Sequence, residues 1–161
     1  MNLINYIKVY KNVVSDSFCD KMIQKFEDNP KQYHYQKRAN PVRNFKMSFN
    51  QIHIHKETNW KEENKYLLNL FPSYVDKYRE ECNIIESQWP IEWGYEHIRM
   101  KRYQPNRDEF FSPHVDVTKY DNANRFLVFF LYLDNNNAGQ TSFPQFDIGS
   151  NCVKGSLLMF P

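Results

Sequence analysis

Residues 125–133 (RFLVFFLYL) and 155–160 (GSLLMF) are short apolar stretches that are dominated by Phe, Leu and Val. Residues 93–103 (WGYEHIRMKRY) and 140–143 (QTSF) are two further short segments, and polar or glycine-containing turns separate all of them. Aromatic and branched runs of this length, bounded by turn residues, are typical of β-strands. The part of the chain after residue 93 is therefore predicted to be a series of short strands.

Upstream of these segments the sequence predicts a strand and two helices. Residues 6–14 have strand character, and Ser15 and Ser17 are candidate N-caps of a helix that ends before Pro30. The apolar face of that helix consists of Phe18, Met22, Ile23 and Phe26. Asn59 can cap a second, longer helix that ends near Asn83. Helices first and strands afterwards indicate an α+β fold, in which helices cover one sheet of a β-sandwich.

The length and composition favour a single domain. The chain has 161 residues, of which 41% are hydrophobic, and no repeat or linker divides it. We therefore expect one domain over residues 1–161. In it, residues 1–90 would form the first strand and the supporting helices, and residues 91–161 would form the β-core.

Charge and cysteine content bear on the partners and the compartment. A net charge of +2 gives no overall field that favours nucleic acid or a membrane surface as the main partner, so nucleic acid is not expected. Cys19, Cys82 and Cys152 fit neither a disulfide framework nor a zinc knuckle. The N-terminus has no long apolar run. We expect a cytoplasmic protein without a membrane segment, and nothing in the sequence determines its oligomeric state.

The segment Ser112-Pro113-His114-Val115-Asp116 carries the strongest chemical signal. It follows a predicted strand, where alternation would place His114 and Asp116 on one face. An imidazole and a carboxylate, joined by a second imidazole, form the facial triad that leaves open positions on Fe(II). A His-x-Asp pair alone is a weak signal, because solvated His and Asp side chains often lie two residues apart.

The segments around this pair carry a resemblance to a known family. They are Met100-Lys101-Arg102-Tyr103, Pro105 and Phe110-Phe111 before it, and Arg125, Leu131-Tyr132-Leu133-Asp134, Gly139-Gln140-Thr141-Ser142-Phe143-Pro144 and Val153 to Phe160 after it. In this order, residues 98–160 resemble the prolyl 4-hydroxylase branch of the Fe(II)/2-oxoglutarate-dependent dioxygenases. The resemblance implies a double-stranded β-helix, or jelly roll, with N-terminal helices packed on its major sheet.

The resemblance also implies the site residues. His114 and Asp116 would be iron ligands, and Tyr103 and Thr141 would bind the cosubstrate 2-oxoglutarate through hydrogen bonds. Half-buried packing of Tyr103 and a turn role for Thr141 are the alternatives. Arg125 is expected to tether a strand end. The implied activity is hydroxylation of an unactivated C–H by Fe(II), 2-oxoglutarate and O2, supported by ascorbate, on a prolyl or other residue of a peptide or protein, or on a small molecule.

The chain departs from the family at two positions. The family's second histidine follows the strand that matches residues 155–160, and a basic residue that grips the far carboxylate of 2-oxoglutarate comes after it; the sequence stops at Pro161. We expect either that the last strands are missing or that the protein is a catalytically inactive jelly-roll binding module. On either reading these 161 residues should bind iron weakly and turn over little or not at all.

Two other features of the sequence are candidates for a role in function. His53 and His55 could form a second metal site of a cupin-like kind, although a strand with a polar face is the simpler interpretation. Residues 31–46 are basic and aromatic without clean periodicity, which predicts a mobile loop. Tyr35, Arg38 and Arg43 in this loop are candidate substrate contacts, with an ordinary solvated loop as the alternative.

Overall fold

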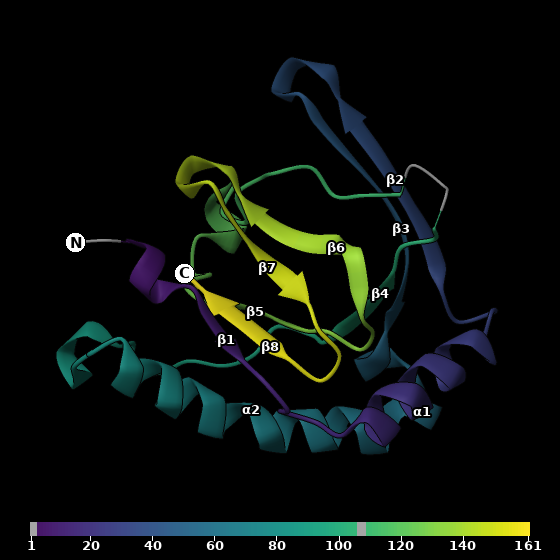
Figure 1. Ribbon diagram of the computed structural model, residues 1–161, viewed down its shortest axis with the longest axis horizontal. Coiled ribbons are helices and arrows are strands. Elements are labelled where there is room, and N and C mark those ends of the chain that lie inside the picture. Colours follow the sequence, from purple (N-terminus) through teal and green to yellow (C-terminus); the bar gives the residue numbers. More distant parts are fainter. Residues whose placement is uncertain (1–2, 106–108) are drawn as a thin grey trace. The chain divides into compact units, whose positions relative to one another are not determined.

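The computed structural model describes residues 3–105 and 109–161, and it has an α+β fold with two α-helices and antiparallel sheets (Figure 1). The expected α+β class is confirmed. The chain forms two compact units, residues 1–28 with 112–161 and residues 29–111. Two sheets belong to the first unit and one to the second, and within the described residues none of them closes into a barrel.

The first unit contains a three-stranded sheet around a buried central strand. Its order is β1 (Lys8–Tyr10), β8 (Leu157–Phe160) and β5 (Val128–Leu131), all antiparallel. Leu157, Leu158 and Met159 are at most 1% exposed. Strand β8 is paired on both sides, so β1 and β5 form the edges of this sheet, and Phe130 of β5 is 37% exposed.

Helix α1 (Asp16–Glu27) lies in the same unit and buries Cys19, Met22 and Phe26. Ser15 caps it as expected, because its hydroxyl accepts from the amide of Phe18. Two contacts join the start of the helix to the turn before β8. The amide of Val13 donates to the carbonyl of Gly155, and Lys154 forms an ion pair with Asp20.

A two-stranded sheet completes the first unit. It pairs β6 (Asn136–Phe143) with β7 (Ile148–Cys152), a strand that the sequence did not predict. Phe143 at the end of β6 packs edge-on against Phe160 of β8, with 4.9 Å between ring centroids. Strand β8 of the three-stranded sheet therefore contacts the β6–β7 sheet through aromatic side chains.

The second unit combines a three-stranded sheet with the long helix α2 (Lys61–Glu81). The sheet order is β2 (His34–Asn40), β3 (Phe45–His53) and β4 (Arg99–Arg102). Helix α2 continues through Pro72, and Trp60, the residue before the helix, is buried. The buried residues within the helix are Glu63, Leu67, Phe71, Val75 and Tyr78. Its regular spacing of apolar residues made this helix predictable.

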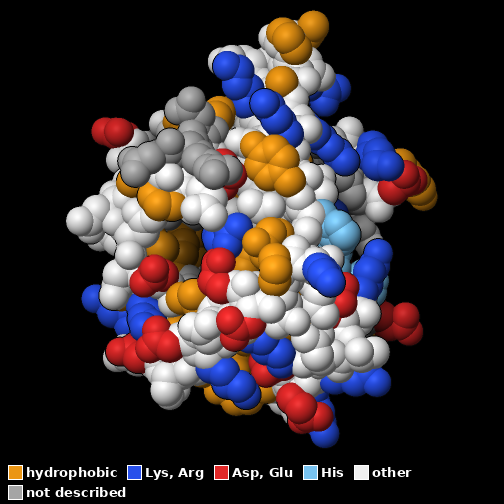
Figure 2. Space-filling model, turned by 90° about the vertical axis from the view of Figure 1, so that its right-hand side faces the viewer, with side chains coloured by type: hydrophobic (Ala, Val, Ile, Leu, Met, Phe, Trp, Pro, Cys, Tyr) orange, Lys and Arg blue, Asp and Glu red, His pale blue; other side chains and the backbone are white. Residues whose placement is uncertain are grey.

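The expected mobile loop over residues 31–46 is largely a β-hairpin. Strands β2 and β3 pair from His34 with Gln51 to Asn40 with Phe45. A short 3-10 turn, Pro41–Arg43, joins them, and Asn44 adopts a left-handed conformation after it. Most β2 side chains on both faces are exposed, which removed the alternation that identifies a strand. Lys and Arg side chains gather along the projecting part of this hairpin (Figure 2).

Short 3-10 helices connect the main elements: η1 (Leu3–Tyr6), η2 (Pro41–Arg43), η3 (Ile54–Lys56), η4 (Thr58–Trp60), η5 (Glu86–Gln88), η6 (Tyr120–Asn122) and η7 (Pro144–Phe146). The three cysteines form no disulfide in the described parts of the chain. Within those same parts, no helix has the length and apolar character that crossing a membrane requires.

Candidate metal centre

His114 and Asp116 lie side by side in the first unit. The Nε2 atom of His114 is 3.3 Å from Oδ1 of Asp116, and the two side chains are 31% and 37% exposed. The segment that carries them is irregular, so the strand alternation that the sequence predicted is wrong. The two side chains nevertheless meet, in a segment that bends at Pro113 and at Asp116.

The hydrogen bond of His114 determines which ring nitrogen faces Asp116. Its Nδ1 lies 2.7 Å from the carbonyl oxygen of Ser112. A carbonyl only accepts, so Nδ1 carries the hydrogen and donates it. In the neutral ring, Nε2 then presents its lone pair beside the Asp116 carboxylate. A ligating histidine whose other nitrogen is held by a carbonyl is the usual arrangement in metal sites.

The spacing of the two atoms suits one divalent ion. Two atoms that each lie roughly 2.1 Å from a metal, at a right angle, are about 3.0 Å apart. The observed 3.3 Å between Nε2 and Oδ1 is close to that value. No cluster of three or more His, Cys, Asp or Glu side chains that could hold a metal occurs within residues 3–105 and 109–161. The residues therefore fit two of the three protein positions of a facial triad.

A loop that sequence reasoning did not single out holds Asp116 in place. The carbonyl oxygen of Asp116 accepts from Nδ2 of Asn122 at 2.7 Å and from Nη1 of Arg125 at 3.3 Å. Oδ1 of Asn122 accepts in turn from the amides of Thr118 and Lys119, both at 3.0 Å. Arg125 thus tethers the candidate ligand itself, whereas the sequence suggested a strand end.

Thr141 lies in a small group of hydroxyls in the same unit. Its Oγ1 is 2.7 Å from the hydroxyl of Tyr132, which donates at 3.5 Å to Oγ of Ser150. Thr141 and Ser150 are paired across β6 and β7. Each hydroxyl has a single hydrogen, and that of Ser150 goes to the carbonyl oxygen of Asn151 at 3.4 Å, so a hydroxyl of this group donates to a carboxylate oxygen only after it gives up its present acceptor. Tyr132 and Ser150 were not candidates from the sequence, since their proximity depends on how β5, β6 and β7 meet.

Tyr103 belongs to the second unit, where it follows β4. Its ring packs against Phe49 at 5.3 Å between centroids, and the residue lies just outside the strand. The side chain is 40% exposed, yet desolvation by burial raises the pKa of its hydroxyl to about 12. The hydroxyl therefore stays protonated at neutral pH and can act as a donor.

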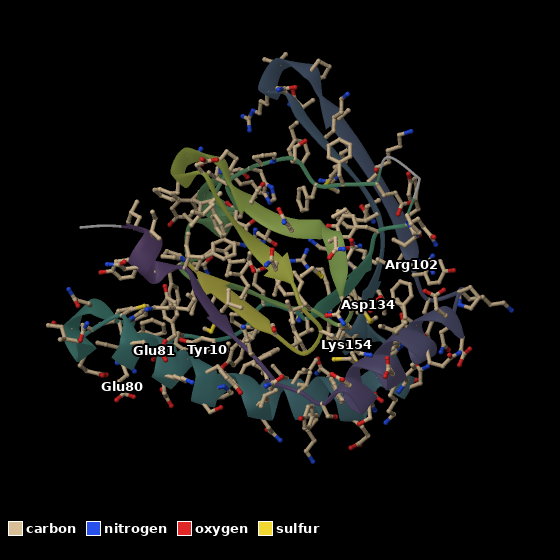
Figure 3. All side chains as sticks on the ribbon, in the orientation of Figure 1. Tyr10, Glu80, Glu81, Arg102, Asp134 and Lys154 are labelled. Carbon is tan, nitrogen blue, oxygen red and sulfur yellow. The ribbon has the colours of Figure 1, made fainter. Side chains whose placement is uncertain are left out.

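The substrate candidates lie on the hairpin of the second unit. Tyr35 is in β2 and 54% exposed, Arg38 is exposed in the same strand, and Arg43 lies in the turn η2. Arg102, which is labelled in Figure 3, lies at the end of β4. Its Cζ is 4.9 Å from the centroid of the Tyr33 ring.

The rival histidine pair has a different geometry. His53 ends β3 and His55 lies in η3, so the two are not on one strand face as predicted. Their rings meet edge to face at 5.8 Å, and His55 stacks on His97 at 3.6 Å between centroids. Parallel stacked rings do not aim their nitrogens at one ion. Burial, followed by the charge of Arg99, lowers the pKa of His53 below its usual 6.5.

Comparisons of the chain with protein-family models, with curated proteins and with solved structures found no match.

Proposed function

We propose that this protein is an Fe(II)- and 2-oxoglutarate-dependent oxygenase whose iron is held by His114 and Asp116. The observation that supports this most is the 3.3 Å separation of Nε2 and Oδ1, with Nδ1 of the histidine bonded to Ser112. Bound iron would supply the O2 chemistry that hydroxylates an unactivated C–H. The sequence resemblance to prolyl 4-hydroxylases supports a prolyl or other peptide residue as the substrate, and a jelly-roll arrangement of the strands.

The chain's own residues have distinct tasks in this proposal. The carbonyl of Ser112 fixes the tautomer of His114, so that Nε2 is the ligating nitrogen. Asn122 and Arg125 hold the main chain of Asp116 and thereby orient its carboxylate. A hydroxyl from the group of Tyr132, Thr141 and Ser150 would donate to a carboxylate of the cosubstrate by giving up its present acceptor.

A second candidate is a binding module that retains the ligand pair without turnover. The observation that favours it is that the described residues supply only two protein ligands to the centre. Two ligands hold a metal more weakly than three and fix fewer of its coordination positions. We accordingly expect weak iron binding and little turnover from these residues.

An anaerobic titration tests the proposal without requiring turnover. Fe(II) is added with 2-oxoglutarate, and the charge-transfer absorption of the iron chelated by the 2-oxo acid is recorded. We expect the band in the wild-type protein and its loss in His114→Ala, while His53→Ala retains it. A wild-type protein without the band, or a His114→Ala variant that keeps it, contradicts the proposal.

Admitting O2 to the same samples then separates the two candidates. Succinate formation, followed by mass spectrometry of a peptide library for the gain of one oxygen atom, identifies an enzyme. Binding of iron and 2-oxoglutarate without succinate formation identifies a binding module.

A further inference from the structure

The segment from Lys31 to Lys56 has a strongly biased charge. It contains no Asp or Glu, and its basic residues are Lys31, Lys37, Arg38, Arg43, Lys46 and Lys56. Strand β4, which pairs with β3, adds Arg99, Lys101 and Arg102 without an acidic residue. The net charge of the whole chain is only +2, because acidic residues elsewhere in the sequence balance the basic residues of this segment.

The strand register shows which of these side chains share a face. Residues directly opposite each other in an antiparallel sheet lie on the same side. Tyr35 pairs with Asn50, which pairs in turn with Arg102, so these three form a row across the sheet. Lys37 opposite Ser48 forms the next row on that face, and Lys46 opposite Ala39 the row after it. Rows two residues apart are separated by about 6.8 Å along the strand.

Several of these cations are not neutralised within the described residues. The side chains of Lys37, Arg38 and Arg43 form no hydrogen bond or ion pair there. Tyr35 is 54% exposed and shares its face of β2 with Lys37, whereas Arg38 lies on the opposite face. Figure 2 shows the Lys and Arg side chains gathered along this projecting hairpin, with hydrophobic side chains among them.

We propose that the β2–β3 hairpin binds single-stranded nucleic acid through Tyr35 and Lys37 on one face of β2 and Arg43 in the turn η2. Cations repeated along a strand suit a phosphate backbone, because each can pair with a phosphate. An exposed aromatic ring among them provides a surface on which an unpaired base stacks. In an acidic protein segment a planar side chain occurs only at some positions, whereas each nucleotide supplies both a phosphate and a planar base, so the nucleic acid is the better match.

The test measures fluorescence anisotropy of a labelled single-stranded 20-mer RNA titrated with the full chain in EDTA. Because no metal is present, failure of this experiment has no bearing on the proposed iron site. For about three phosphate contacts we expect the affinity to fall about twentyfold between 50 and 200 mM salt. Tyr35→Ala should weaken binding about tenfold, while Tyr35→Phe, which keeps the ring, should not.

A matched pair of charge variants locates the surface. Lys37→Gln with Arg43→Gln removes two hairpin cations, whereas Lys61→Gln with Lys65→Gln removes two exposed cations of α2. We expect the first pair to weaken binding at least tenfold and the second to leave it within twofold, with thermal unfolding confirming that both fold.

Three results would overturn the proposal. The first is that the RNA does not bind at 50 mM salt, and the second is that both charge variants lose the same amount of RNA affinity. The third is that Tyr35→Ala leaves the RNA affinity unchanged and polyglutamate displaces the RNA completely. The last result would assign the face to an acidic protein.

Discussion

Asn122→Asp should misplace Asp116 while leaving the loop around it largely intact. The substitution keeps the acceptor oxygen that receives the amides of Thr118 and Lys119. It replaces the donor that lies 2.7 Å from the carbonyl oxygen of Asp116 with a second carboxylate oxygen. The lost hydrogen bond is worth about 1 kcal/mol, or roughly fivefold in an equilibrium constant. Repulsion between the two oxygens adds to this, whereas Arg125 still holds the carbonyl at 3.3 Å.

We therefore expect Asn122→Asp to weaken Mn(II) binding about tenfold, which is at the lower end of the effect of partners that orient metal ligands. Mn(II) is measured by the loss of its free electron paramagnetic resonance signal. Hydrogen exchange at the amides of Thr118 and Lys119 should change little in Asn122→Asp but accelerate in Asn122→Ala, which removes both acceptor and donor. If Asn122→Asp binds Mn(II) as tightly as the wild type, this loop does not position Asp116 and the reasoning is refuted.

Three other predictions concern stability and the cosubstrate. Gly155→Ala should destabilise the fold by about 2 kcal/mol in denaturant unfolding, because the residue has φ +72° and an added Cβ would lie 2.7 Å from a main-chain oxygen. As a control, Gly94→Ala places its Cβ in open space and should change the free energy of unfolding by less than about 0.5 kcal/mol. Since burial lowers the pKa of His53, the unfolded state binds more protons below about pH 6.5, and the free energy of unfolding should fall as the pH is lowered from 7 to 5. His53→Gln should flatten that profile, and an unchanged slope would refute the assignment. Tyr132→Phe, which removes the hydroxyl 2.7 Å from Thr141, should weaken 2-oxoglutarate binding to the Mn(II)-loaded protein about fivefold by calorimetry; equal affinities would exclude Tyr132 from that site.

The two helices were predictable because their apolar faces are regular. In α1 the expected residues Met22 and Phe26 are buried. The third buried residue of the helix is Cys19, whereas Phe18, which was expected on the apolar face, is only partly buried. Strand β7 was missed because Gly149, Ser150 and Asn151 have low strand propensity, and pairing with β6 overrides that preference. The β2–β3 hairpin was missed for a different reason, since exposure on both faces leaves no alternation to detect.

The candidate site was predictable only at its ligands. His114 and Asp116 are separated by one residue, so their meeting required little of the fold. Asn122 and Ser150 act through contacts that depend on a returning loop and on strand register, and no periodicity marks them. The prediction that His53 and His55 lie on one strand face was wrong, because β3 ends at His53 and His55 lies in η3. The alternation of Ile52 and Ile54 with these histidines does not show where the strand ends.

The affinity for Mn(II), a redox-stable substitute for Fe(II), tests the central claim most directly. The wild-type protein is compared with His114→Ala, Asp116→Ala and, as a control in the other histidine group, His53→Ala. We expect measurable binding that weakens more than tenfold in each of the first two variants and is unchanged in the third. Wild-type affinity in His114→Ala, or loss of binding in His53→Ala alone, would contradict a metal centre at His114 and Asp116.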